Sequence, residues 1–131
     1  MSYRAPVSKM SFLLNEILAA DRLAATDRFS DATRDIADAI LSEAAKMSED
    51  VLAPLNRVGD THPAVVENGV VRTSPGFADG YRAIAEGGWV GMAADAEFGG
   101  MGLPIALTVC VNEMMASACM PLSLNPLMPQ G

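Results

Sequence analysis

Residues able to do acid–base chemistry are few and scattered along this sequence. Glu113 is the only charge in the apolar stretch 103–128, where burial would raise the pKa of its carboxyl group toward a range useful for proton abstraction. A helix-end hydrogen bond or an interdomain pair is the interpretation that we favour for it. We expect Asp95 and Glu97 to be solvated loop charges or caps, and His62 to be a turn residue.

The sequence offers no constellation for metal binding or redox chemistry. Cys110 and Cys119 are the only cysteines, and on one continuous helix they would lie about 13.5 Å apart. A disulfide needs Cα atoms within about 7 Å, so we expect two small buried thiols in a reducing compartment. The single histidine and the absence of a C-x-x-C spacing leave no zinc site to assemble.

The most distinctive spacing is a glycine-rich segment before the apolar stretch, Phe98-Gly99-Gly100-Met101-Gly102-Leu103-Pro104. Backbone amides of such a loop could hold a phosphate at the start of a helix. The segment lacks the Lys-Ser/Thr of a P-loop and the spacing of a dinucleotide fingerprint. The alternative interpretation is that the glycines only let two helices connect tightly.

Composition limits the classes of function. The chain has 131 residues, 50% of them hydrophobic and 19% charged, which indicates one apolar globular domain. A net charge of −7 excludes nucleic acid as a partner, because phosphates demand clustered basic residues. The stretch 103–128 is long enough to cross a bilayer, but its prolines and the absence of Lys or Arg after Arg82 argue against a membrane span.

The apolar spacing predicts a mainly α fold with one short β-hairpin. A first helix is predicted from Ser11, its N-cap, to about Ala20, with one narrow apolar face (Phe12, Leu13, Ile17, Leu18). A long amphipathic helix is predicted from the cap Ser30 to about Pro54, where apolar residues recur at spacings of three and four (Ile36, Ile40, Ala44, Met47, Val51, Leu55).

The hairpin is predicted at 64–67 and 70–73, around Asn68-Gly69, the pair best suited to a type I′ turn. Ser74-Pro75 is predicted to cap a third helix that ends at Gly87-Gly88. After the loop 89–102 the chain returns to helix until Pro121, and the residues Leu122 to Leu127 begin another helix.

Two of these segments together carry a family resemblance. Gly87-Gly88-Trp89-Val90-Gly91-Met92, then the glycine-rich segment and Glu113, resemble the N-terminal domain of acyl-CoA dehydrogenases. The matching motif positions are Gly88, Trp89, Gly91, Phe98, Gly99, Gly100, Gly102, Leu103, Pro104 and Glu113. Tyr3-Arg4-Ala5-Pro6-Val7 and Glu67-Asn68-Gly69-Val70-Val71 resemble the larger bacterial branch, which acts on long-chain acyl-CoAs in some members and methylthio-propanoyl-CoA in others.

The resemblance implies a subunit of three parts: a helical N-terminal domain, a middle β-domain and a C-terminal helical bundle, with FAD held by the last two. A glutamate of the C-terminal part removes the α-proton, the flavin takes the β-hydride, and the product is a 2,3-enoyl-CoA. Electrons leave to an electron-transfer flavoprotein. We therefore expect residues 1–131 to be the first part only, without catalytic, cofactor-binding or metal-binding residues of their own.

The same resemblance implies a role in lining the acyl pocket for the end of the last long helix and the turn beyond it, namely Met120, Leu122, Ser123, Leu124, Asn125 and Met128. Plain core packing is the alternative for this methionine-rich stretch. The resemblance also implies a cytoplasmic homo-oligomer active in fatty-acid β-oxidation.

Three hypotheses follow for the chain itself. The favoured one is a fragment of a flavoenzyme, inactive alone and marginally stable or oligomeric when isolated. The second is a non-catalytic helical interaction module that works with a partner chain, for which the apolar last third would be the interface. The third is a small acyl-binding protein without flavin.

Overall fold

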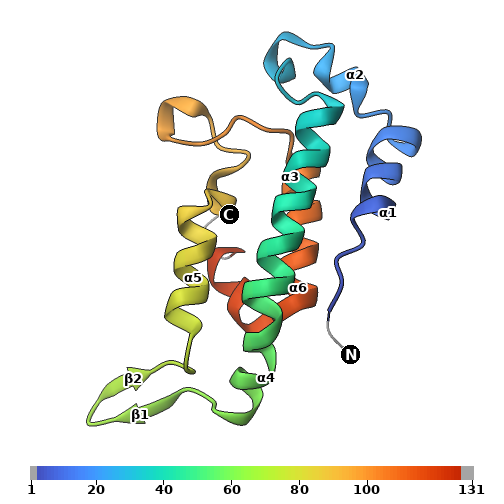
Figure 1. Ribbon diagram of the computed structural model, residues 1–131. Helices are drawn as coiled ribbons and strands as arrows, with labels where there is room; N and C mark the ends of the chain where they lie inside the picture. Colours follow the sequence, from blue (N-terminus) through green and yellow to red (C-terminus); the bar gives the residue numbers. More distant parts are fainter. Residues whose placement is uncertain (1–2, 128–131) are drawn as a thin grey trace.

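The computed structural model describes residues 3–127, which form a helical body with one projecting hairpin (Figure 1). Two segments, Leu13–Ile17 and Met47–Leu52, have the wider turns of a π-helix. The elements in chain order are α1 (Val7–Phe12), α2 (Asp21–Ala24), α3 (Arg34–Lys46), α4 (Ala53–Thr61), β1 (Val65–Glu67), β2 (Val70–Arg72), α5 (Phe77–Glu86) and α6 (Ile105–Leu127).

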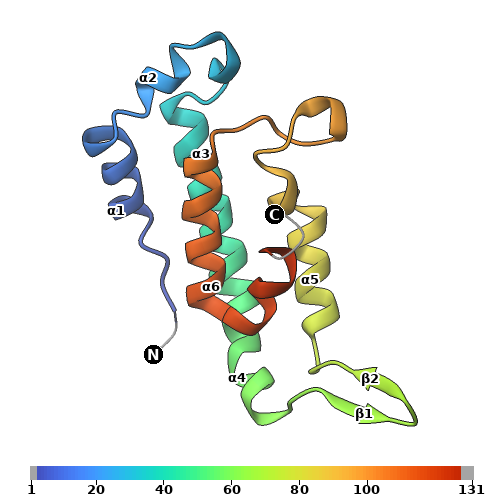
Figure 2. The same ribbon diagram turned by 180° about the vertical axis from the view of Figure 1, so that it is seen from behind.

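Two long rods form the centre of the molecule. Helices α3 and α4, joined by the π-helical segment, make one rod, and α6 packs along it, as the two opposite views show (Figures 1 and 2). The contact between the rods contains side chains with no exposed surface: Leu41, Ala44 and Leu52 from the first rod, and Val111, Met114 and Met115 from α6. Burial of these apolar side chains is the main stabilising contribution to the fold.

Helix α6 is, by length and composition, a candidate membrane span. Its window Ile105–Pro126 has a mean hydropathy of 1.5, and 44% of that window is buried inside the protein. A helix that packs against the core of a soluble domain passes the same test. The contacts of α6 with the α3–α4 rod account for the buried part of its apolar sequence.

The first helix differs from the sequence prediction. It begins at Val7 rather than at Ser11, whose hydroxyl instead donates to the Asp38 carboxylate at 2.6 Å. Met10 and Leu14 are buried, whereas the predicted apolar face (Phe12, Leu13, Ile17, Leu18) is between 41% and 64% exposed. The predicted face was wrong because the sequence carries two apolar stripes here, and only contact with α3 selects one.

The long helix begins later and ends later than predicted. Thr33, not Ser30, is the N-cap of α3, and its hydroxyl accepts from the Ile36 amide at 3.4 Å. The rod also continues past Pro54 to Thr61. Just before this proline the amide of Ala53 donates to the carbonyl of Ser48, five residues back. These wider turns redirect the carbonyls that the proline ring would meet in a regular helix.

The hairpin prediction is confirmed. β1 and β2 pair antiparallel, with Val66 opposite Val71, and the turn residues Asn68 and Gly69 have φ of 52° and 76°, as a type I′ turn requires. Helix α5 ends at Gly87-Gly88 as predicted. Its start was predicted two residues too early, because Gly76, in the left-handed conformation, stands at the N-cap instead of Ser74.

The last helix turns back on itself near its end. Cys119 is non-helical, with φ −154° and ψ 84°, and the chain resumes a helical course from Met120 to Leu127. We call residues 119–125 the elbow. Figure 1 shows it turned in between α5 and the α3–α4 rod. The predicted change of helix at Pro121 is thus confirmed, with the break two residues earlier, since a proline disfavours helical geometry in the residues before it.

Candidate functional site: the glycine turn and the elbow

The glycine-rich motif forms a closed turn between α5 and α6. Its two arms, residues 91–95 and 100–103, run side by side and are joined by backbone hydrogen bonds. Met101 donates to the Gly91 carbonyl at 3.1 Å, and Leu103 donates to the Met92 carbonyl at 2.9 Å. The loop therefore returns the chain to the start of α6 with a fixed geometry.

Gly100 makes the closest approach in this turn. A Cβ atom at this position would collide with the backbone carbonyl of Ala94 and would lie 2.6 Å from the Ala94 side chain. Gly88 and Gly99 have φ of 73° and 81°, a conformation that L side chains rarely adopt. Gly88, Gly99 and Gly100 are thus explained by backbone packing and backbone conformation.

This turn does not fit a phosphate or the diphosphate of a flavin. The amides of residues 99 to 102 all donate to carbonyls of the loop itself, at 2.9 to 3.1 Å. Amides already committed to internal bonds are not free to bind an anion. The geometry supports the interpretation that the glycines let α5 and α6 connect tightly.

The other motif residues are divided between core and surface. Leu103 and Pro104 are buried at the start of α6, and Trp89 is half-buried beside Gly87. Phe98 is 80% exposed at the tip of the turn. The two acidic residues of the turn are exposed, and Asp95 lies 3.6 Å from the exposed guanidinium of Arg28, which agrees with a solvated loop charge.

The elbow brings together five of the six residues expected to line an acyl pocket, and Met128 lies outside the described residues. They occupy two sides of one short helical segment. Leu122 and Ser123 point into the core, whereas Met120 and Leu124 are 58% and 52% exposed and Asn125 is exposed beside them. The inner side therefore packs in the core, and the outer side presents an accessible apolar surface.

The inner side fixes the elbow in place. The Ser123 hydroxyl donates to the carbonyl of Met120 at 2.9 Å, which closes the first turn after the break. Leu122 packs against α5 at Gly80, where an added Cβ would lie 2.7 Å from its methyl carbon. Because the inner side of the elbow is fixed, the side chains on its outer side have a defined position.

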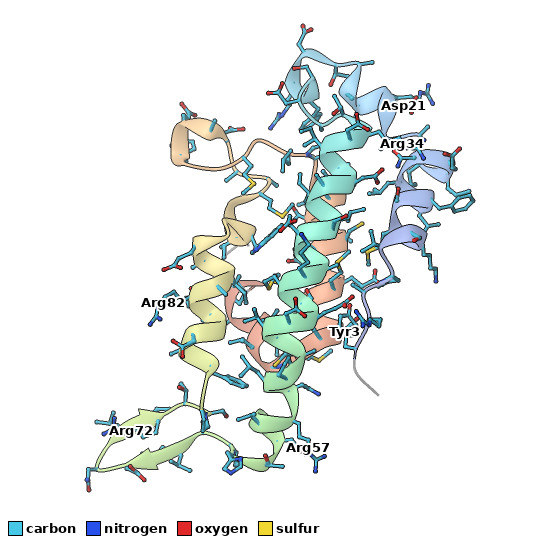
Figure 3. The ribbon with its side chains drawn as sticks, in the orientation of Figure 1. Tyr3, Asp21, Arg34, Arg57, Arg72 and Arg82 are labelled. Carbon is cyan, nitrogen blue, oxygen red and sulfur yellow. The ribbon has the colours of Figure 1, made fainter. Side chains whose placement is uncertain are left out.

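A polar cluster that the sequence did not predict joins the N-terminal segment to the rods. The Glu49 carboxylate accepts the Ala5 amide at 2.9 Å and an Arg4 N–H at 2.6 Å, and these two bonds, the amide first, lower the pKa of Glu49. Burial, and then the negative charges of Glu113 and Glu49, raise the pKa of Tyr3. Figure 3 shows Tyr3 beside the lower half of the rod.

Several predicted candidates have ordinary surroundings. Glu113 is exposed, so it lacks the burial that would suit it to proton abstraction. His62 follows α4, with its ring nitrogen 2.9 Å from the Thr61 hydroxyl. Cys119 is a buried free thiol as expected, whereas Cys110 is only half-buried, and burial raises the pKa of both. Within the described part of the chain, no three metal-ligating side chains come together.

Comparison with known proteins agrees with this geometry. Residues 35–130 match the family "Acyl-CoA dehydrogenase, N-terminal domain". The chain is 34% identical over 131 residues to the 3-methylmercaptopropionyl-CoA dehydrogenase of Ruegeria pomeroyi, covering all of this chain and 22% of that protein. It is 30% identical over 118 residues to a broad-specificity linear acyl-CoA dehydrogenase of Mycobacterium tuberculosis, covering 88% of this chain and 19% of that protein.

The chain thus spans about a fifth of the length of these two relatives. The family match includes α3 to α6, the glycine turn and the elbow. On these grounds the chain belongs to the acyl-CoA dehydrogenase family, as its N-terminal helical domain.

Proposed function

We propose that this chain is the N-terminal part of an FAD-dependent dehydrogenase that converts an acyl-CoA to a 2,3-enoyl-CoA, and that the outer side of its elbow forms one wall of the acyl pocket. The single observation that carries the proposal is the structure of the elbow. Accessible apolar side chains project from its outer side, while Leu122 and Ser123 fix its inner side in the core. When bound, the flavin accepts the hydride.

In this proposal the chain contributes binding and exclusion of water rather than proton transfer. Each methylene of an acyl tail that leaves water for an apolar wall gains about 0.8 kcal/mol. Met120 and Leu124 supply such a wall, and methionine adapts its flexible side chain to tails of different shape. Because these side chains are exposed within residues 3–127, the opposite wall must come from another part of the protein.

The relatives suggest the substrate class. Their names state 3-methylmercaptopropionyl-CoA and linear acyl-CoAs. We therefore propose an unbranched acyl-CoA thioester as the substrate of the parent enzyme. The other domains, further subunits and an electron-transfer flavoprotein are its proposed partners, in the cytoplasm.

Exposed apolar side chains elsewhere on α6 support packing against such further domains. Ile105 and Val109 are 65% and 58% exposed and lie one turn apart on the same face of the helix. Contiguous apolar surface of this kind is typical of an interface. By itself the chain is proposed to be inactive, because none of its described residues is placed to act as the base.

The test is to express the longest continuous reading frame that contains these 131 residues. A purified yellow protein whose flavin absorbance is bleached by an acyl-CoA would support the proposal. A soluble, colourless protein that does not respond to acyl-CoA would overturn it and favour the interaction module.

A paired substitution tests the elbow in the same protein. Leu124→Asp places a carboxylate against the acyl tail and should raise the KM for acyl-CoA about tenfold or more, because an unpaired charge is costly in an apolar pocket. Val66→Asp is the matched control, since Val66 is 72% exposed on the hairpin. Equal KM values for the two variants would show that the elbow does not line the acyl pocket.

A further inference from the structure

Helix α4, helix α5 and the elbow meet in one close contact, and this contact sets the distance between the elbow and α5. Gly80, in α5, is buried, and an added Cβ would lie 2.6 Å from a methyl carbon of Leu55 in α4 and 2.7 Å from a methyl carbon of Leu122 in the elbow. Real carbon contacts are about 3.5 to 4.0 Å long. With the two leucine side chains in these positions, there is no room for a side chain at residue 80.

The glycine is required for space and not for its backbone conformation. Gly80 lies inside α5, and its amide donates to the Gly76 carbonyl at 2.9 Å, so alanine would fit its backbone. Glycine inside a helix is about 1 kcal/mol less favourable than alanine. The contact with the two leucines is the feature of the structure that offsets this cost.

The position of Leu122 is linked to the outer side of the elbow. Leu122 is 4% exposed, and the next residue, Ser123, closes the turn by donating to the carbonyl of Met120. Met120 and Leu124 project from the opposite side of the same turn. A displacement of the inner side away from α5 therefore moves the outer side outward.

We propose that Gly80, together with Leu55 and Leu122, is a positioning element that sets the depth of the acyl pocket and so the preferred length of the acyl chain. This inference rests on the proposed function of the elbow. Gly80 does not touch the substrate; it acts through Leu122. Selectivity for chain length is thus determined partly by α4 and α5, outside the pocket wall itself.

The test is Gly80→Ala in the full-length flavoprotein. The added methyl group requires the methyl carbons of both leucines to move back by about 1 Å, and Leu122, which is 4% exposed, has little free space to rotate into. The elbow then moves toward the bound acyl tail and shortens the pocket. Since one methylene in an apolar pocket changes kcat/KM by about tenfold or more, we expect the long-chain to short-chain ratio of kcat/KM to fall about tenfold.

Three further variants separate positioning from loss of stability. Gly59→Ala is the matched control, because the three atoms nearest its added Cβ all belong to the ring of Phe77, the closest at 2.8 Å, and it should leave the ratio unchanged. Leu122→Val in the Gly80→Ala background removes a methyl group at the contact and should restore the ratio. Leu122→Val alone should raise the ratio, and it remains informative if Gly80→Ala does not fold.

The outcomes are distinguishable. A ratio that is the same in the Gly80→Ala, Leu122→Val and unsubstituted proteins, all folded and flavin-loaded, would refute the positioning role and leave the proposed function intact. If the unsubstituted protein does not oxidise acyl-CoA, the proposed function fails and the inference fails with it. A ratio that falls with Gly80→Ala and recovers with Leu122→Val would establish it.

Discussion

Replacing Gly100 with alanine tests whether the family motif is a close backbone packing point. The new Cβ would collide with the carbonyl of Ala94, and this carbonyl also accepts the Gly102 amide at 2.9 Å. An exposed side chain could rotate away from a new methyl group, but a hydrogen-bonded backbone carbonyl cannot. The two arms of the turn must therefore separate.

The expected loss of stability follows from these contacts. Overpacking costs about 1–3 kcal/mol, and a fixed backbone places this case at the upper end. Loss of the Gly102 bond adds about 1 kcal/mol. We expect a total of about 4 kcal/mol, and with an m value of about 2 kcal/mol/M this lowers the urea midpoint by about 2 M.

The assay is urea unfolding of the 131-residue chain, followed by circular dichroism, with the same stabilising osmolyte in every sample. Gly91→Ala is the control, because its nearest neighbour is the Gly100 Cα at 3.7 Å, and it should change stability by less than about 0.5 kcal/mol. Gly99→Ala should fall between the two, since its φ of 81° costs an alanine about 1–2 kcal/mol but no atom is within 4 Å. Equal stabilities for the Gly91 and Gly100 variants would refute the packing argument.

Three further predictions concern the helical body. Glu49 has a lowered pKa, so its contribution to stability is present above the ordinary value of 4.5 and is lost as the pH falls through the lower folded value; in acid titrations Glu49→Gln should unfold with a shallower pH dependence. Thr33→Ala removes the cap of α3 and should cost about 1 kcal/mol, measured as a lower Tm. Cys110 and Cys119 have raised pKa values, so both should react with iodoacetamide more slowly in the folded chain than in urea.

Local turn chemistry could be predicted from the sequence. Asn68-Gly69 alone specifies a hairpin, because both residues tolerate the positive φ of a type I′ turn. The end of α5 at Gly87-Gly88 and the change of direction near Pro121 follow from equally local preferences. These positions need no knowledge of distant contacts.

Features decided by tertiary contact could not be predicted. Leu14 is buried and Phe12 is exposed, although both are apolar residues at the junction of α1 and the π-helical segment that follows it. The passage of the rod past Pro54 depends on a π-helical segment that no sequence rule signals. The contact of Glu49 with the Ala5 amide joins residues far apart in the chain.

In the candidate site, too, local features could be predicted from the sequence and features that depend on tertiary contacts could not. The glycine motif is visible in the sequence, but whether its amides were free for a phosphate depends on hydrogen bonds between the two arms of the turn. The resemblance pointed to the stretch 120–128, whereas the separation of Leu122 from Leu124 depends on the break at Cys119. Gly80 carried no signal at all, because its neighbours come from α4 and the elbow.

The central proposal is that the outer side of the elbow touches the acyl tail. Photoaffinity labelling tests this directly, with the full-length flavoprotein, an acyl-CoA that carries a diazirine at the end of its chain, and peptide mapping after cleavage at Glu113. We predict label on Met120, Leu124 or Asn125, competed by unlabelled acyl-CoA. Label confined to other parts of the protein, while the acyl-CoA still bleaches the flavin, would contradict the account.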